Sequence, residues 1–295
     1  MYRSINLKDI SSADAQNFLQ HAVAPRPICF ASTINGRGNV NLSPFSFFNL
    51  FSTNPPIVIF SASRRVRNNT TKHTLQNILE VPEVVINIVS FDMVQQVSLS
   101  SCEYPDGTDE FLKSGFTKIP SLFIKPPRVM ESPVQMECKV LEVKSLGTTG
   151  GPGNLIIAEV LMMHINENIL GENGKIDQRK LDLVARLGNN WYARINADNL
   201  FEVEKPNTDI GIGIDNLPDS IRYSKILSGN HLGQLANVYE MPLIDPSFED
   251  DKLKNIFQYY SLNPAEMEKE LHLYASELLD KRKVTEAWQV LLALV

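Results

Sequence analysis

Short apolar segments separated by turn residues fill most of the first two hundred positions of the chain. Residues 28–31, 57–60 and 84–89 are almost entirely apolar, which is typical of buried strands. Residues 134–140 alternate between apolar and polar side chains, which predicts a half-exposed strand. The apolar phase then slips to Leu141, and this slip predicts a bulge near residues 140–141.

Turn residues and helix caps divide these strands. Residues 35–38 (Asn-Gly-Arg-Gly) and the glycine-rich residues 147–153 each lie between two strand patterns, so both predict hairpins. The second segment lacks the Lys and Ser/Thr ending of a phosphate-binding loop. Residues 110–112 predict a helical turn, and the strand after Pro55 and Pro56 should begin at Ile57, because proline cannot donate to a ladder. Helices are expected behind the N-caps Ser11 or Ser12, Thr70 with Thr71, and Asp92.

The pattern changes after residue 200. Asn263 and Pro264 predict a helix start, and residues 265–279 carry apolar side chains at helical spacing. Residues 286–295 are apolar enough that they must pack either on this core or on a second subunit. Many short strands with a few inserted helices indicate a barrel and not an alternating βαβ sheet. We therefore expect a mainly β domain with helical insertions over 1–200 and a C-terminal, largely helical extension over 201–295.

Composition limits the function classes. Hydrophobic content of 43% and charged content of 21% are those of a soluble globular protein, and a net charge of -6 argues against nucleic acid as the main partner. Three cysteines, Cys29, Cys102 and Cys138, have no metal-site spacing and suggest reduced thiols in a cytoplasmic protein. The N-terminus has no signal-peptide pattern, and the most apolar run, 287–295, is too short to span a membrane.

Charge distribution gives the first sign of a ligand. No Asp or Glu occurs between residues 15 and 79, where an even spread of the chain's 34 acids would place about seven. Six cations lie in the same window, which suits an anionic ligand. Hydroxyl groups and cations before the helix at 70–79 favour a phosphate site, and Phe45, Phe47 and Phe48 could face a flat ring. Flavin mononucleotide (FMN) fits this set of residues, but pyridoxal phosphate and a phosphorylated sugar fit it too. The alternative without a ligand is a solvated basic loop followed by an ordinary helix cap.

An ordered series of motifs over roughly residues 20 to 195 is more specific. It resembles the flavin reductase-like family of FMN-binding split barrels, through Pro25-Arg26-Pro27-Ile28, Ser32-Thr33, the run from Asn41 to Asn49, Asn54-Pro55-Pro56, the run from Lys72 to Ile78, Lys125-Pro126-Pro127-Arg128, Glu131-Ser132-Pro133, Glu137-Cys138, Glu159 to His164, and Arg186-Leu187-Gly188. The chain departs from the family pattern at His73, where Asp is common, at Ala158, and at Asn189-Asn190.

The resemblance implies a set of cofactor-binding residues. The residues implied around the flavin ring are Ser32, Thr33, Asn41, Ser43, Phe45, Ser46 and Phe47, and those around the ribityl phosphate are Ser61, Ser63, Arg64, Lys72 and Thr74. It also implies a homodimer with the flavin near the subunit interface.

The implied activity is hydride transfer from NADH or NADPH to FMN and then to an acceptor, either a small molecule or a redox partner protein. His164 resembles a histidine that lies close to the arriving nicotinamide, and the alternative is a histidine satisfied at a strand end. Trp191 and Tyr192 could line the substrate entrance, although core packing fits at least one of them. Two other functions stay open: a flavoredoxin-like electron carrier, and a flavin-binding interaction protein whose segment after residue 200 recruits a partner.

Overall fold

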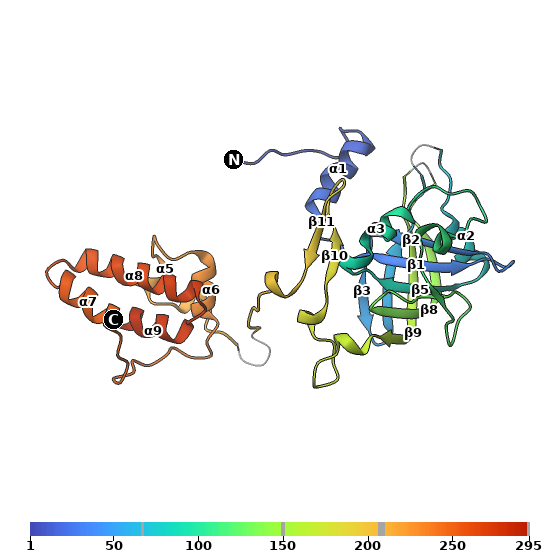
Figure 1. Cartoon of the computed structure of the whole chain (residues 1–295). Helices are drawn as coiled ribbons and strands as arrows, with labels where there is room; N and C mark the ends of the chain where they lie inside the picture. Colours follow the sequence, from blue (N-terminus) through green and yellow to red (C-terminus); the bar gives the residue numbers. More distant parts are fainter. Residues whose placement is uncertain (66–67, 149–150, 206–209, 294–295) are drawn as a thin grey trace. The chain divides into compact units, whose positions relative to one another are not determined.

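The computed structural model describes residues 1–65, 68–148, 151–205 and 210–293, and the chain forms two compact units, Met1–Phe201 and Glu202–Val295. Figure 1 shows that the first unit holds the strands and the second consists of helices and loops. The predicted fold class, mainly β with helical insertions followed by a largely helical C-terminal part, is confirmed. None of the described helices is long and apolar enough to cross a membrane.

Seven strands of the first unit form one antiparallel sheet in the order β2-β1-β5-β8-β9-β4-β3. These strands are β1 (Cys29–Ile34), β2 (Val40–Phe45), β3 (Phe48–Thr53), β4 (Pro56–Ser61), β5 (Glu83–Ile88), β8 (Val134–Ser145) and β9 (Asn154–Ile165). The edge strands β2 and β3 are joined by Ser46 and Phe47 alone, and so short a link spans no more than about 10 Å. The two edges of the sheet therefore lie close together, and the sheet curls into a barrel that is not closed by pairing between β2 and β3.

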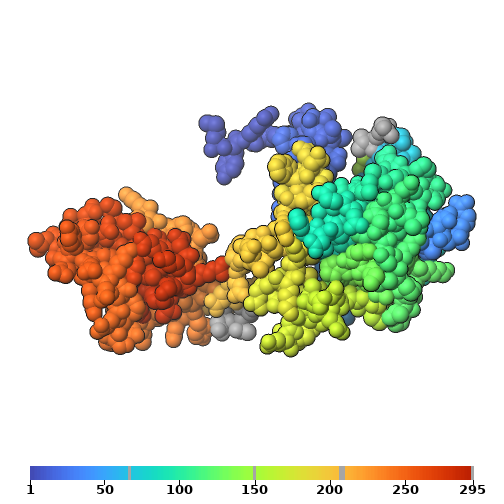
Figure 2. Space-filling model, viewed as in Figure 1, coloured from blue at the N-terminus to red at the C-terminus, as the bar shows by residue number. Residues whose placement is uncertain are grey.

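Smaller elements complete the first unit. The strands β6 (Lys118–Ile119) and β7 (Arg128–Val129) pair, as do β10 (Leu183–Arg186) and β11 (Tyr192–Ile195). The helices are α1 (Ser12–Ala22), α2 (His73–Glu80), α3 (Val94–Leu99) and α4 (Glu110–Ser114), with 3₁₀ turns η1 (Phe91–Met93), η2 (Glu167–Ile169), η3 (Gln178–Lys180) and η4 (Ala197–Asn199). Figure 2 shows α1 against the hairpin of β10 and β11, where Arg26 donates to Gln20 O and to Leu187 O.

Both predicted hairpins are confirmed. Ile34 pairs with Val40 across the first turn, and Ser145 pairs with Asn154 across the second, of which residues 149 and 150 lie outside the described part. The predicted bulge is also confirmed, because the register of β8 against β9 shifts between Val140 and Glu142. The strand after the prolines begins at Pro56 and not at Ile57, since a proline can occupy the first position of a strand without donating.

The expectation of a half-exposed strand at 134–140 is wrong. Gln135 is 7% exposed and Glu137 is fully buried, although both are polar. Their partners explain this burial: Gln135 Nε2 donates to Val129 O at 2.9 Å, and Glu137 accepts from the backbone N–H groups of Leu122 and Phe123. A polar side chain can be buried when its hydrogen bonds are satisfied.

Helix boundaries were predicted less well than strands. Ser11 caps α1 as expected, with its hydroxyl accepting from Asp14 N. The helix α2 begins at His73 with Lys72 as N-cap and no capping side chain, so the expectation of caps at Thr70 and Thr71 is wrong. Asp92 lies inside η1, whose N-cap is Ser90, so it is not a cap either.

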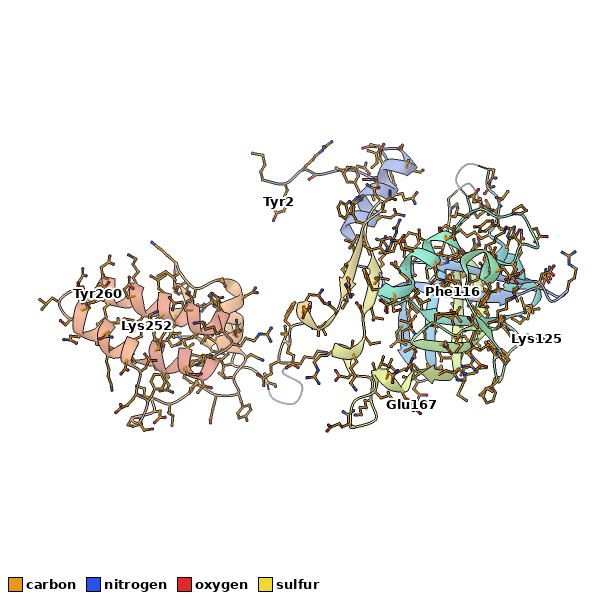
Figure 3. The ribbon with its side chains drawn as sticks, viewed as in Figure 1. Tyr2, Phe116, Lys125, Glu167, Lys252 and Tyr260 are labelled. Carbon is orange, nitrogen blue, oxygen red and sulfur yellow. The ribbon has the colours of Figure 1, made fainter. Side chains whose placement is uncertain are left out.

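The alternation of β1 supplies two cores, one on each face. Cys29 and Ala31 join the core that packs against α2, and Phe30 joins the core that packs against α3 and α4. In the second core the rings of Phe30 and Phe116 lie 5.2 Å apart, edge to face, and Figure 3 labels Phe116 among the barrel side chains. The sheet is thus fixed against helices on both faces beside β1.

The second unit has a separate core. Its elements are η5 (Ile214–Asn216), α5 (Asp219–Arg222), α6 (Gly229–Ala236), α7 (Asp251–Tyr260), α8 (Pro264–Asp280) and α9 (Val284–Leu292). The helix α8 has Asn263 as N-cap and Pro264 in its first turn, as predicted. The apolar C-terminal segment packs within this unit: Trp288 is 1% exposed and donates from Nε1 to Leu235 O at 3.2 Å.

Because the cores of the two units contain no common residue, we expect a chain ending at Phe201 to fold by itself. Thermal unfolding of this fragment, followed by circular dichroism, should remain cooperative. Its far-UV spectrum should match the spectrum of the full chain after the contribution of the helices in residues 202–295 is subtracted. An insoluble fragment would instead mean that residues 202–295 cover apolar surface of the barrel.

Candidate functional site

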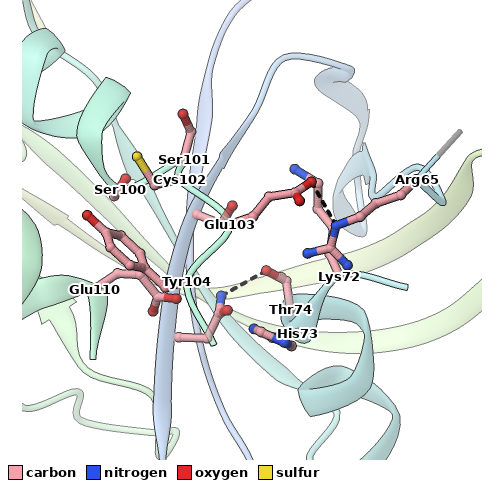
Figure 4. A pocket seen from close by; sticks show the side chains of 12 residues that line it. Arg65, Lys72, His73, Thr74, Ser100, Ser101, Cys102, Glu103, Tyr104 and Glu110 are labelled. Carbon is pink, nitrogen blue, oxygen red and sulfur yellow. Dashed lines mark hydrogen bonds and ion pairs between the residues drawn. The ribbon is translucent and has the colours of Figure 1, made fainter. Parts of the chain in front are cut away.

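A polar pocket opens between β2, the start of α2 and the segment that follows α3 (Figure 4). The residues that line it are Asn41, Ser43, Arg65, Lys72, His73, Thr74, Ser100, Ser101, Cys102, Glu103, Tyr104 and Glu110. Four of the residues that the sequence assigned to the cofactor are among them, namely Asn41, Ser43, Lys72 and Thr74.

Hydrogen bonds join β1, β2 and α2 on the near side of the pocket. Asn41 Nδ2 donates to Thr74 Oγ1 at 2.9 Å, and Asn77 Nδ2 donates to Thr33 Oγ1 at 3.2 Å. Thr33 and Asn41 are direct partners in the register of β1 and β2, so their side chains point to the same face of the sheet. The structure therefore brings Thr33, Asn41 and Thr74 together, whereas the family resemblance implies Thr33 and Asn41 at the flavin ring and Thr74 at the ribityl phosphate.

Two cations lie at the end of the pocket where α2 begins. Lys72 is the N-cap residue of α2, and its Nζ lies 4.9 Å from the centre of the Phe45 ring. Arg65 donates from Nη1 to Thr70 Oγ1 and to Thr71 O, which fixes its guanidinium beside the loop. Burial lowers the pKa of Lys72, and the charge of Arg65 lowers it further. A helix N-terminus with two neighbouring cations is a site for an anion.

Three of the residues expected at the phosphate do not line this pocket. Arg64 donates from Nε to Asn69 Oδ1 at 2.6 Å and from Nη2 to Asn69 O, so its guanidinium is engaged within its own loop. Ser61 ends β4 and donates its backbone N–H to Phe47 O, and Ser63 lies in the loop that follows. Arg65, which the sequence does not predict as a site residue, lines the pocket, whereas Arg64 does not.

Ser32 faces the opposite side of β1 from Thr33. Strand alternation places it with Phe30, and its side chain is fully buried. Its Oγ has no hydrogen-bond partner within the described part of the chain. The hydroxyl of Ser32 therefore lies on the opposite face of the sheet from Thr33 and Asn41.

Ser46 and Phe47 form the corner between β2 and β3. Arg26, itself 7% exposed, donates from Nε to Ser46 Oγ at 3.4 Å, and its guanidinium lies 5.8 Å from the centre of the Phe47 ring. Phe47 is 44% exposed, so its ring is available to a ligand. Arg26 also holds the end of α1, by donating to Gln20 O and Val23 O. The sequence predicts Arg26 only as part of a family motif, because no local pattern shows which backbone it contacts.

The two aromatic residues expected at the entrance differ in environment. Trp191 is 72% exposed at the turn between β10 and β11. Tyr192 packs against the core beside α3, with the Arg186 guanidinium 4.5 Å from its ring centre. Trp191 is thus open to a ligand, whereas Tyr192 has the packing role that was the alternative for one of the pair.

His164 is held by a buried carboxylate. It lies on β9, four strands from β2 in the sheet order, and its Nε2 is 2.7 Å from Glu137 Oε1. Burial alone would raise the pKa of Glu137, but the N–H groups of Leu122 and Phe123 together with His164 outweigh it, and the pKa lies below its ordinary value. This pairing matches the alternative of a histidine satisfied near a strand end.

The pocket is not free of acids, although residues 15–79 are. Glu103 and Glu110 come from outside that window and line the far wall. Burial raises the pKa of Glu110, whose Oε2 accepts from Leu42 N at 3.1 Å. An acid-free stretch of sequence predicts one wall of a site only, because the opposite wall is brought in by tertiary packing. No group of side chains suited to a metal ion occurs among the described residues.

The sheet order and the open edge between β2 and β3 define the fold as a split barrel. The chain belongs to the flavin reductase-like family, because the family model described as flavin reductase like domain matches residues 21–181. The described helices of the second unit lie outside that match.

Comparisons with individual proteins agree. An uncharacterized protein of Aquifex aeolicus is 36% identical over 172 residues, which cover 58% of this chain and 85% of the relative. An uncharacterized protein of Halalkalibacterium halodurans is 32% identical over 204 residues, which cover 68% of this chain and 96% of the relative. Nitrilotriacetate monooxygenase component B from Bacillus cereus superposes with a TM-score of 0.65 at 28% identity over 69% of this chain and 99% of that chain. Flavoredoxin of Desulfovibrio vulgaris shares the fold, with a TM-score of 0.53 at 19% identity over 69% of this chain and 97% of that chain. The family indicates a flavoprotein with flavin-related oxidoreductase chemistry.

Proposed function

We propose that the chain binds FMN in the pocket beside β2 and α2 and transfers a hydride from NADH or NADPH through the flavin to an acceptor. The observation that carries the proposal is the convergence of Arg65, Lys72 and Thr74 at the start of α2. Charged donors and a helix N-terminus recognise a phosphate, which flavin mononucleotide has and riboflavin lacks. The acceptor belongs to either of two classes, a small molecule or a redox partner protein.

The pocket residues would bind the cofactor at two ends, one for the phosphate and one for the ring. Lys72, Arg65 and the first N–H groups of α2 would hold the phosphate, and Thr33, Asn41 and Ser43 supply hydrogen-bonding groups along the two strands. Phe47 would cover a face of the ring with its exposed surface. The residues implied by the family resemblance at Ser61, Ser63 and Arg64 would act through the loop that carries Arg65, since their own side chains do not line the pocket.

Flavin supplies the hydride chemistry when it is bound, so the protein needs no acid–base pair. The proposed part of His164 is to contact the nicotinamide through Nδ1, because Nε2 faces Glu137. Trp191, which is exposed, would cover the entrance. Both residues therefore position a substrate and take no part in proton transfer.

We also propose a homodimer. Large apolar side chains stay exposed on strands β3 and β9, namely Leu50, Phe51, Leu161 and Met163. Exposed apolar surface is a common site of contact between subunits, so we propose that a second subunit covers these side chains.

The direct test is NAD(P)H oxidation by the purified full chain, with and without added FMN. We expect oxidation to require FMN, and we expect FMN to raise the melting temperature, because a ligand that binds only the folded state stabilises it. A protein whose melting temperature FMN leaves unchanged would refute the cofactor. Bound FMN without nicotinamide oxidation, for any common acceptor, would favour the flavoredoxin-like electron carrier.

A further inference from the structure

A carboxylate lies at the cationic end of the pocket. Glu103 follows α3, and its Oε1 is 3.0 Å from Arg65 Nε, the ion pair drawn as a dashed line in Figure 4. Arg65 and Glu103 are 38 positions apart in sequence, so tertiary packing brings this acid to the proposed phosphate site.

The charges around Lys72 explain why an anion is stabilised there. Arg65 and Lys72 both line the pocket. Burial is the main cause of the lowered pKa of Lys72, repulsion by Arg65 lowers it further, and Glu103 acts in the opposite direction. An opposite charge within a few ångströms offsets such repulsion. Glu103 thus gives the two cations the electrostatic partner that a phosphate would also give them.

Glu103 can also leave this position. Its side chain is 59% exposed, whereas that of Arg65 is 21% exposed. The segment 101–105 contains no helix or strand, so a movement of Glu103 breaks no regular hydrogen-bond ladder. A partly solvated carboxylate loses little when it exchanges its cation for water.

We infer that Glu103 is an intramolecular competitor of the flavin phosphate for Arg65 and Lys72. The inference rests on the proposed FMN site and deepens it. A carboxylate beside a phosphate dianion raises the free energy of the complex, and so lowers its affinity.

The test compares FMN with riboflavin, which has the same ring but no phosphate. Titrations followed by flavin fluorescence would use the full-length wild type, Glu103→Gln and, as a control with the same loss of charge, Glu172→Gln, an exposed turn residue outside the pocket. We expect Glu103→Gln to bind FMN about tenfold more tightly while its riboflavin affinity stays within about twofold of the wild type. Glu172→Gln should match the wild type for both ligands. Glu103→Ala should repeat the result of Glu103→Gln, which separates the loss of charge from any effect of the amide.

Three outcomes would overturn the inference. Unchanged FMN affinity would mean that Glu103 does not compete, and weaker affinity would mean that Glu103 is needed to hold Arg65 in place. An equal gain for FMN and riboflavin would mean that its effect is not on the phosphate. In all three, FMN binding by the wild type leaves the proposed function standing, whereas a wild type that binds no FMN refutes the proposed function itself.

Discussion

Replacing Lys72 by alanine is expected to weaken FMN binding by roughly 10- to 100-fold, because a hydrogen bond to a charged group contributes about 1.5–3 kcal/mol. The ammonium group is only partly accessible at the N-cap of α2, and water therefore replaces it poorly. Arg65 remains in Lys72→Ala, so binding should be weakened and not abolished. Fluorescence titration with FMN measures the change.

The matched control is Lys175→Ala, which removes the same side chain from an exposed turn outside the pocket and should leave FMN affinity unchanged. Lys72→Arg should recover part of the affinity, because it restores the charge with a different donor geometry. Riboflavin should bind wild type and Lys72→Ala alike. If Lys72→Ala and Lys175→Ala both bind FMN as tightly as the wild type does, the phosphate does not lie at the start of α2.

The near wall of this site could be predicted because its residues are close in sequence or paired by a hairpin. The turn at 35–38 sets the register that places Asn41 opposite Thr33, and α2 is the next element after β4, separated from it by residues 62–72. Strand alternation also separates two of the predicted residues: Ser32 and Thr33 are neighbours, so only one of them can face α2.

The far wall could not be predicted in this way. Glu103 and Glu110 reach the pocket only because α3 and α4 pack on the outer face of β1 and β2, and no local pattern encodes that contact. The same limit applies to Glu137. Alternating polarity in a strand predicts exposure, but a long-range loop supplies two backbone donors that make its burial favourable.

Glu137→Ala is expected to destabilise the barrel by about 3–5 kcal/mol, which is the usual result of removing one member of a buried ion pair. The cation of this pair is Arg128, whose Nε lies 3.9 Å from Glu137 Oε1. The carboxylate is fully buried and accepts from Leu122 N at 2.8 Å, from Phe123 N at 2.7 Å and from His164 Nε2. Alanine leaves two backbone donors with no acceptor, and each such group costs about 1–3 kcal/mol. The loop carrying Leu122 and Phe123 should loosen first.

Native-state hydrogen exchange measured by mass spectrometry would locate the effect. Protection should fall in peptides from β8 and β9, while peptides from α8 and α9 should exchange as in the wild type, since their core is separate. Glu142→Ala, at an exposed position of the same strand β8, should change stability by less than about 0.5 kcal/mol.

The pH dependence of the same variant tests the electrostatic part of this argument. The folded pKa of Glu137 is lowered, so its carboxylate stabilises the barrel fully above the unfolded pKa of about 4.3, and that contribution is lost as the pH falls through the folded value. The stability difference between the wild type and Glu137→Ala should therefore be constant near neutral pH and shrink in acid. A difference that stays the same at pH values below the unfolded pKa would show that Glu137 stabilises the barrel by packing, and that its charge contributes nothing.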